Sequence, residues 1–369
     1  MQINTIKTSQ KSFHVTWQDG TDSEFPFIWL RDNDAKELHP QTRERIFDLT
    51  SVPLSLTPEH YCLEGGALEV RWPNKETSSV YPLAWLYAHQ PGSRRVDIAT
   101  IDKVFWDAQS LTQITSFDAT RCAQSGDELR KMMQALKRTG LVLIDRLEHS
   151  MTAGEDFGDL IGFKRQSNFG VIFDVISKAE PVNLAYTSVA LPLHTDLPNQ
   201  SNVPSYQFLH CYLNSVEGGE SVFADGFKIC ADFAEQAPSK FELLTTIQVP
   251  WRFHDGACDI RSHRPIINLG PDGKLECFLF NAHLADVPDM PIDLLHDFYV
   301  AYQDLMQRIR DPKYAIYHLL KPGQMVIFDN QRALHSRTEF DANSGERHLR
   351  GYYIDSNELD SKIRMLASA

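Results

Sequence analysis

The sequence predicts a mainly β protein with flanking helices, made of a small N-terminal β-rich domain over residues 1–92 and a larger domain over residues 93–369. Length is the first reason, because 369 residues are long for one simple core and an accessory domain is expected beside a larger one. The second is the segment Gln90–Arg95, whose proline, glycine and serine have the composition of a linker. The third is the pattern before this linker, where residues 13–25 contain two alternating runs around Asp19-Gly20, typical of a β-hairpin.

Local signals define further elements in the larger domain. Ser125 has the chemistry of a helix N-cap and Gly140 that of a helix end, so we expect a helix between them. The apolar run Leu141–Ile144 that follows predicts a buried strand. The spacing of apolar residues over 291–310 predicts a long amphipathic helix.

Composition narrows the class of protein. With 42% hydrophobic and 23% charged residues, the chain is typical of a globular protein. A formal net charge of -13 argues against nucleic acid, whose binding requires clustered lysine and arginine. Six cysteines lie singly with no Cys-x-x-Cys, which suits a reducing compartment. Without an apolar leader or a run that could span a bilayer, the chain is expected to be soluble, cytoplasmic and not bound to membranes.

Three residues carry the most informative chemical pattern. His194 and Asp196 are separated by one residue, which in an extended segment places both side chains on the same side. His335 follows an apolar strand and a polar turn that could return it to this pair. Two imidazoles and a carboxylate form the facial triad of non-heme Fe(II) oxygenases. The short motif is weak by itself, and the alternatives are a histidine in a capped turn and a satisfied histidine at a strand end.

Two further segments could bind a small anion near such a metal. Arg347 lies in an alternating run that predicts a strand beside the one carrying His335, and its guanidinium could hold a carboxylate in a bidentate pair. A surface ion pair is the alternative. The segment 216–226 places paired glycines before Ser221, which could bring backbone close to a ligand, although by itself it predicts only a hairpin.

Together these features resemble the taurine dioxygenase superfamily of Fe(II)/2-oxoglutarate oxygenases, and within it the γ-butyrobetaine hydroxylase and trimethyllysine hydroxylase family. The resemblance covers nearly the whole chain, and the matching segments, in family order, are Trp29–Asn33, Tyr81–Leu86, Leu193–Asp196, Tyr206–Cys211, Gly218–Ser221, Phe328–Asn330 and Arg347–Leu349. The resemblance implies that residues 93–369 form a double-stranded β-helix, a jelly roll, and that the protein could be a homodimer.

The resemblance also implies an activity and its residues. His194, Asp196 and His335 would bind Fe(II), while Arg347, helped by the Ser221 hydroxyl, would hold the distal carboxylate of 2-oxoglutarate. The reaction would consume O2 and 2-oxoglutarate and yield succinate, CO2 and a hydroxylated small molecule. A non-catalytic binder of betaine-like solutes is the alternative, although it would not need a complete facial triad.

The expected substrate is a small trimethylammonium zwitterion such as γ-butyrobetaine. Matching the chain to the γ-butyrobetaine enzymes places four aromatic residues where that family encloses the trimethylammonium group, namely Phe169, Phe173, Tyr186 and Tyr353. Ring faces bind such a cation by cation–π attraction, but Phe169 and Phe173 could instead be core residues.

The opposite end of the substrate is less well defined by the match. Asn183 corresponds to one asparagine that holds the substrate carboxylate in the family, whereas Phe280, with Asn281 one position later, stands at the second. A phosphonate such as 2-(trimethylammonio)ethylphosphonate, or an unrelated small anion, therefore remains an alternative substrate.

In the family, the small domain usually holds a structural zinc through three cysteines that follow the first matching segment and a later histidine. Here residues 32–40 contain no cysteine, and Asp34 and Lys36 stand where the first two thiolates would be. A lysine ammonium cannot ligate zinc, so we predict that this domain binds none.

Overall fold

The computed structural model describes residues 1–73, 75–93, 96–176 and 187–368. The chain divides into two compact units, Met1–Asp97 and Ile98–Ala369, and each is described by itself.

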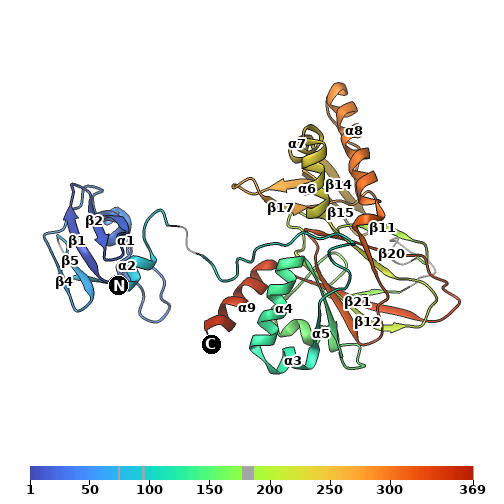
Figure 1. The fold of residues 1–369 in the computed structure, drawn as a ribbon, viewed down its shortest axis with the longest axis horizontal. Helices are drawn as coiled ribbons and strands as arrows, with labels where there is room; N and C mark the ends of the chain where they lie inside the picture. The colour runs from blue at the N-terminus through green and yellow to red at the C-terminus, as the bar shows by residue number, and fades with distance from the viewer. Residues whose placement is uncertain (74, 94–95, 177–186, 369) are drawn as a thin grey trace. The chain divides into compact units, whose positions relative to one another are not determined.

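The first unit is built from two small antiparallel sheets around an aromatic core (Figure 1). One sheet contains β1 (Ile3–Thr8), β2 (Ser12–Trp17) and β3 (Asp22–Pro26), and the other β4 (His60–Glu64), β5 (Ala67–Arg71) and β6 (Ser79–Pro82). The short helices α1 (Phe27–Asp32) and α2 (Leu83–Ala88) follow β3 and β6. The predicted hairpin is β2–β3. Aromatic side chains fill the core, including Phe13, Trp17, Phe25, Phe27, Trp72 and Tyr81.

A buried ion-pair cluster occupies the region where the family resemblance implies zinc. Asp34 is buried, and its carboxylate accepts hydrogen bonds from the Ser79 hydroxyl and from Lys75 Nζ, the latter at 2.5 Å. Lys75 Nζ also lies 2.8 Å from Glu37 Oε1. Burial alone would raise the pKa of Asp34, but the bonds from Lys75 and Ser79 outweigh it and the pKa is lowered. These residues do not fit a zinc site, because the carboxylate already neutralises an ammonium group.

The second unit contains the two facing sheets of a double-stranded β-helix, as predicted (Figure 1). The larger sheet has the order β10-β21-β12-β19-β8-β7, with β9 paired to β21. Its strands are β7 (Ser116–Asp118), β8 (Leu141–Asp145), β9 (Lys164–Arg165), β10 (Phe173–Val175), β12 (Tyr206–Asn214), β19 (Gln324–Asp329) and β21 (Arg347–Ile354). The smaller sheet has the order β11-β20-β13-β18, with β11 (Leu191–His194), β13 (Ser221–Asp225), β18 (Ala315–His318) and β20 (Ala333–Arg337).

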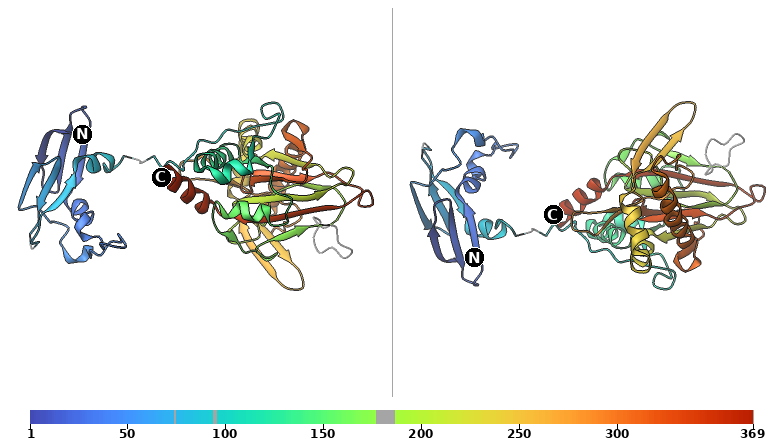
Figure 2. Two further views of the ribbon diagram at one scale, coloured as in Figure 1. Left: turned by 90° about the horizontal axis from the view of Figure 1, so that it is seen from below. Right: turned by 90° about the horizontal axis from the view of Figure 1, so that it is seen from above.

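Alternation along the strands separates two apolar layers. In β8, Val142 and Ile144 belong to one buried cluster and Leu141 and Leu143 to another. The first cluster is completed by α4 (Gly126–Thr139) and α9 (Ser356–Ser368), which remain adjacent in both views of Figure 2. Shorter helices, α3 (Ala119–Gln124) and α5 (Ala153–Asp159), lie on the same side. The predicted caps of α4 are confirmed, since the Ser125 side chain accepts from the Glu128 N–H and Gly140 has φ 74°.

A long insertion between β13 and β18 forms a further layer with its own core. It comprises α6 (Gly226–Gln236), α7 (Pro238–Thr246), β14 (Val249–His254), β15 (Asp259–Arg264), β16 (Ile267–Leu269), β17 (Leu275–Phe278) and α8 (Ile292–Ile309). The helix expected at 291–310 is α8. The β14–β15 hairpin contributes part of the wall of the cavity described below.

One predicted neighbour relation is wrong. The strand carrying Arg347 is β21, which pairs with β10 and β12 in the larger sheet, whereas His335 lies on β20 in the smaller sheet. The two residues therefore lie on different sheets that face each other, and their strands do not pair. Alternation within one segment does not reveal which sheet a strand joins.

Among the described residues, no helix is both long and apolar enough to cross a membrane.

Candidate active site and metal centre

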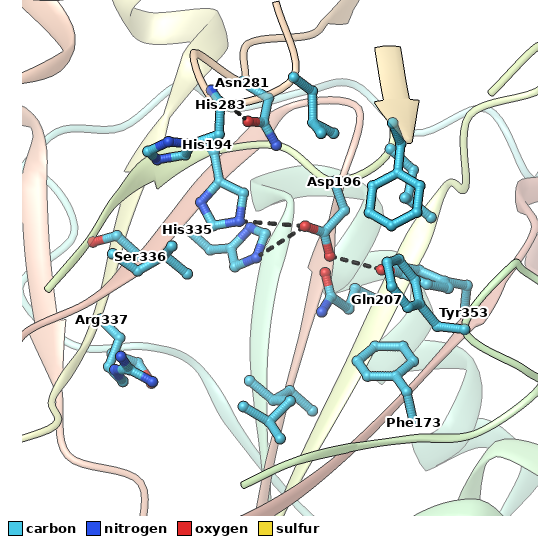
Figure 3. Close-up of a pocket in the computed structure, with 18 of the residues that line it drawn as sticks. Phe173, His194, Asp196, Gln207, Asn281, His283, His335, Ser336, Arg337 and Tyr353 are labelled. Carbon is cyan, nitrogen blue, oxygen red and sulfur yellow. Dashed lines mark hydrogen bonds and ion pairs between the residues drawn. The ribbon is translucent and has the colours of Figure 1, made fainter. Parts of the chain in front are cut away.

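The three predicted metal ligands converge at the end of the smaller sheet (Figure 3). His194, the last residue of β11, pairs directly with His335 of β20, and their ring centroids are 4.2 Å apart. Asp196 Oδ1 lies 3.3 Å from His194 Nε2 and 3.7 Å from His335 Nε2. One ligand atom from each residue lies within 4.8 Å of the other two, and in the described part of the chain this is the one such group of three or more.

A buried asparagine fixes the loop that carries Asp196. Strand β11 ends at His194, so Asp196 lies beyond the extended segment expected from the sequence. Its backbone N–H donates to Asn330 Oδ1 at 2.6 Å, and Asn330 Nδ2 donates to the carbonyls of Asp196 and Pro204, each at 3.0 Å. The next residue, Leu197, has φ 57°, which bulky side chains rarely adopt. The turn that orients the carboxylate is thus held from both sides.

A second buried contact fixes the turn before His335. Arg332 and Asp225 are fully buried and form a bidentate pair, in which the guanidinium Nε and one terminal nitrogen donate to the two carboxylate oxygens at 3.0 and 2.8 Å. Asp225 ends β13 and Arg332 precedes β20. The pair therefore fixes the entry of the strand that presents His335.

The protonation states of the triad suit metal binding. The His194 Nδ1–H donates to the Pro192 carbonyl at 2.8 Å, so Nε2 is the ring nitrogen that faces Asp196 and can reach a metal ion. Burial, followed by the neighbouring His194, lowers the pKa of His335 to about 3, so this imidazole is neutral at physiological pH. Burial alone would raise the pKa of Asp196, but His335, His194 and the Tyr353 hydroxyl hold it well below its usual range. Neutral imidazoles and an ionised carboxylate are the forms that bind a metal ion.

The triad faces a cavity of about 510 Å³ whose two ends differ in chemistry. Figure 3 shows Ser336 and Arg337 on one side of the triad and Phe173 and Tyr353 on the other. The full lining comprises Phe169, Phe173, Val175, Leu191, His194, Asp196, Leu197, Gln207, Leu209, Ser221, Arg252, Phe253, His254, Asn281, His283, Leu284, His335, Ser336, Arg337, Arg347 and Tyr353. A cavity of this size, in which aromatic and aliphatic walls meet converging polar groups, is typical of a small-molecule site.

The cationic end contains Arg347, which has no carboxylate partner among the residues the structure describes. Its Nε is buried and has no hydrogen-bond partner in the part of the chain that the structure describes. Its guanidinium lies 5.5 Å from the centroid of the Phe340 ring. Burial, followed by the nearby Arg337, lowers the pKa of Arg347 to about 10, so it stays charged at neutral pH. Gly219 lies beside this guanidinium with φ 72°, a left-handed conformation that favours glycine.

Two more residues complete this end. Ser221 is buried and pairs in register with Arg337 across β13 and β20. Arg337 donates to the carbonyls of Thr187 and Val189 at 2.8 and 2.6 Å. Sequence reasoning missed Arg337, although its position two residues after His335 on a strand, and so on the same face, could have indicated it.

The aromatic end contains two ring pairs. Phe173 and Tyr353 have centroids 5.4 Å apart, and Phe169 and Phe253 have centroids 5.3 Å apart. Phe169 and Phe173 are only partly buried and belong to none of the core clusters, so the structure places them on the cavity wall and not in the core. Phe253, from the β14–β15 hairpin, was missed because no local signal ties this hairpin to the triad.

Two predicted substrate-binding residues, Asn183 and Tyr186, lie outside the described residues. Which of Phe280 and Asn281 occupies the second anion-binding position stays a prediction, but the structure shows where each side chain lies. Phe280 is buried, and its ring centroid lies 5.7 Å from that of Tyr302, whereas Asn281 lines the cavity. The Asn281 amide donates to the Thr195 carbonyl at 3.1 Å and accepts from the backbone N–H of His283 at 3.1 Å.

Comparison with known proteins agrees with this geometry. Residues 107–353 match the model of the taurine catabolism dioxygenase TauD, TfdA family, and residues 4–87 match that of the gamma-butyrobetaine hydroxylase-like N-terminal domain. The chain belongs to the TauD, TfdA dioxygenase family. It is therefore a 2-oxoglutarate-dependent dioxygenase that uses Fe(II), with O2 and a small molecule as the other reactants.

Individual relatives cover almost the whole chain. It is 36% identical over 358 residues to the gamma-butyrobetaine dioxygenase of Pseudomonas sp. (strain AK-1), covering 95% of this chain and 93% of that one. It is 26% identical to the mitochondrial trimethyllysine dioxygenase of Mus musculus, and the match covers 99% of this chain and 90% of that one.

Solved structures share the fold at low identity. An asparagine oxygenase has a TM-score of 0.51 at 15% identity and covers 64% of this chain and 83% of its own. A taurine dioxygenase from Burkholderia xenovorans has a TM-score of 0.50 at 15% identity, and the match covers 69% of this chain and 90% of that one. These two likenesses support the jelly-roll fold alone.

Proposed function

We propose that this dioxygenase hydroxylates a small trimethylammonium zwitterion of the γ-butyrobetaine type. The observation that carries the proposal is the pair of aromatic contacts, Phe173 with Tyr353 and Phe169 with Phe253, on the wall of the cavity that the triad faces. Similarity to a gamma-butyrobetaine dioxygenase and a trimethyllysine dioxygenase supports the same substrate class, since γ-butyrobetaine and trimethyllysine both carry a trimethylammonium group.

In this proposal, His194, Asp196 and His335 hold the iron. The fit is supported by the two imidazoles and one carboxylate whose ligand atoms come together beside a cavity. When bound together with 2-oxoglutarate, Fe(II) supplies the activation of O2 that hydroxylates the substrate while succinate and CO2 are released. The remaining polar groups orient the two organic reactants around this centre.

Arg347 is the proposed partner of the distal carboxylate of 2-oxoglutarate. Its buried Nε has no acceptor among the described residues, and leaving a buried donor unsatisfied costs about 1–3 kcal/mol, which a carboxylate would recover. A guanidinium can offer two parallel donors to one carboxylate, which fixes direction as well as distance. Ser221, buried at the same end of the cavity, can add a hydroxyl donor.

The aromatic end is the proposed site of the trimethylammonium group. A quaternary ammonium cannot donate a conventional hydrogen bond, so ring faces bind it through cation–π attraction of about 0.5–2 kcal/mol for each good contact. The other end of such a substrate is anionic, and the nearby polar residues Asn281, His283 and Arg252 line the same cavity. Arg252 already pairs bidentately with Asp259, and the Asn281 amide already donates one hydrogen to the Thr195 carbonyl. The candidates for this anion are therefore the His283 ring and the second amide hydrogen of Asn281.

A substrate panel tests the proposal. The purified protein, with Fe(II) and 2-oxoglutarate, is assayed for succinate release with γ-butyrobetaine, trimethyllysine, 2-(trimethylammonio)ethylphosphonate and taurine, and each product is measured by mass. We expect γ-butyrobetaine to gain one oxygen atom and to give the highest kcat/KM. If the phosphonate is preferred, the anionic group of the substrate is a phosphonate and not a carboxylate. Turnover of taurine alone would contradict the trimethylammonium assignment.

A further inference from the structure

Tyr353 belongs to both halves of the candidate site. Its ring lies 5.4 Å from that of Phe173 and lines the aromatic end of the cavity. Its hydroxyl donates to Asp196 Oδ2 at 2.7 Å, as the dashed line in Figure 3 marks. Only 3% of the residue is exposed, so this contact is shielded from water. A hydrogen bond to a carboxylate is stronger in such a buried environment than in water.

The two oxygens of Asp196 have separate partners. Oδ1 is the oxygen that lies 3.3 and 3.7 Å from the Nε2 atoms of His194 and His335. Oδ2 is turned toward Tyr353 and is occupied by its hydroxyl. The carboxylate therefore presents a single oxygen to the point where the two imidazoles meet.

The larger sheet fixes the backbone that carries the tyrosine. Tyr353 lies in β21 and pairs with Gln207 of β12 on one side and Arg165 of β9 on the other. Pairing with two strands holds the backbone in place, so only rotation of the side chain can move the hydroxyl. The hydroxyl thus acts on Asp196 from a fixed backbone position, as hydrogen-bonding partners of metal ligands commonly do.

We propose that Tyr353 is a positioning residue that holds Asp196 in a one-oxygen orientation toward the iron, while its ring forms part of the trimethylammonium site. This inference rests on the proposed function and assigns one of its substrate-binding residues a second role. A cation packed against the ring would restrain the hydroxyl that orients the metal ligand. Substrate and metal would then strengthen one another's binding by the same factor, as linkage requires.

The test separates the hydroxyl from the ring. Tyr353→Phe removes the hydroxyl and keeps the ring, whereas Phe173→Leu removes a neighbouring ring and keeps the hydroxyl. Binding of Mn(II), which favours the same class of oxygen and nitrogen ligands, is measured by titration calorimetry without O2, with and without γ-butyrobetaine. Thermal melting of each variant checks that it remains folded.

We expect Tyr353→Phe to weaken Mn(II) binding by about 10- to 100-fold, the usual effect of losing such a partner, and to lose the strengthening by γ-butyrobetaine. Phe173→Leu should leave Mn(II) affinity as in the parent protein and weaken γ-butyrobetaine binding. A folded Tyr353→Phe variant that binds Mn(II) as tightly as the parent would overturn the inference.

The Asp196→Ala variant separates this inference from the proposed function. If it loses Mn(II) binding while Tyr353→Phe keeps it, the iron site stands and only the role of Tyr353 fails. If Asp196→Ala binds Mn(II) like the parent protein, the metal-site assignment itself fails.

Discussion

Gly351 gives a sharp test of the aromatic site, because this glycine makes room for one of its rings. It lies in β21 opposite Phe173 of β10. A Cβ at this position would come 2.4 and 2.5 Å from the Cε2 and Cζ atoms of Phe173. Carbon atoms pack at roughly 3.5–4.0 Å, so in Gly351→Ala the ring must move by about 1 Å or more.

The expected magnitude follows from the contact that is lost. Displacing Phe173 removes one cation–π contact, worth about 0.5–2 kcal/mol, which corresponds to a roughly 2- to 30-fold rise in the Kd of γ-butyrobetaine. The extra methyl group also costs about 1–3 kcal/mol of stability through overpacking. Ser221 and Arg347 are neighbours of Arg337, which Figure 3 shows on the other side of the triad from Phe173, so the KM for 2-oxoglutarate should stay unchanged.

Steady-state kinetics with each reactant varied in turn measure the effect. Gly256→Ala is the matched control, because a Cβ there meets nothing within 4 Å and no left-handed φ is involved. The double variant Gly351→Ala, Phe173→Leu should recover melting temperature without recovering substrate affinity. An unchanged KM for γ-butyrobetaine, or an equal rise for both reactants, would refute the reasoning.

Three further substitutions test other parts of the molecule. Arg347→Lys should raise the KM for 2-oxoglutarate roughly 10- to 150-fold, since about 1.5–3 kcal/mol is lost with a charged hydrogen bond, and an unchanged value would contradict its role. Lys75→Met should destabilise the N-terminal unit by about 3–5 kcal/mol in urea unfolding, because it leaves the buried Asp34 carboxylate unpaired. Folding lowers the pKa of Asp34, so its ionised carboxylate stabilises the folded unit above its unfolded pKa of about 3.9, and this stabilisation is lost as the pH falls below that value. A parent protein whose free energy of unfolding does not fall in acid would oppose this. Asn330→Ala should lower both melting temperature and Mn(II) affinity, since it releases the turn that carries Asp196, and full metal affinity would argue against that clamp.

Local chemistry made much of the fold predictable. Ser125 and Gly140 bound α4 because a hydroxyl acceptor and a left-handed glycine satisfy helix ends regardless of distant contacts. The apolar run at 141–144 became β8, and the amphipathic spacing at 291–310 became α8. Periodicity indicates the type of an element, but it does not identify which strand lies beside it. This is why the segment carrying Arg347 was assigned the wrong neighbour.

The candidate site shows the same limit at the level of side chains. A one-residue separation and a family resemblance were enough to single out His194, Asp196 and His335, which the structure brings together. Phe253 reaches the cavity from an insertion whose own sequence has no feature of an active site. The hydrogen bond from Tyr353 to Asp196 joins residues far apart in the chain, and only the folded sheet defines it.

Iron location in crystals tests the central claim most directly. Anomalous diffraction at the iron edge, from crystals grown with Fe(II) and 2-oxoglutarate without O2, would mark the metal position independently of the protein chain. We expect a single iron peak bonded to His194 Nε2, Asp196 Oδ1 and His335 Nε2, with 2-oxoglutarate extending toward Arg347. A peak elsewhere, or one that His335 does not reach, would contradict the account.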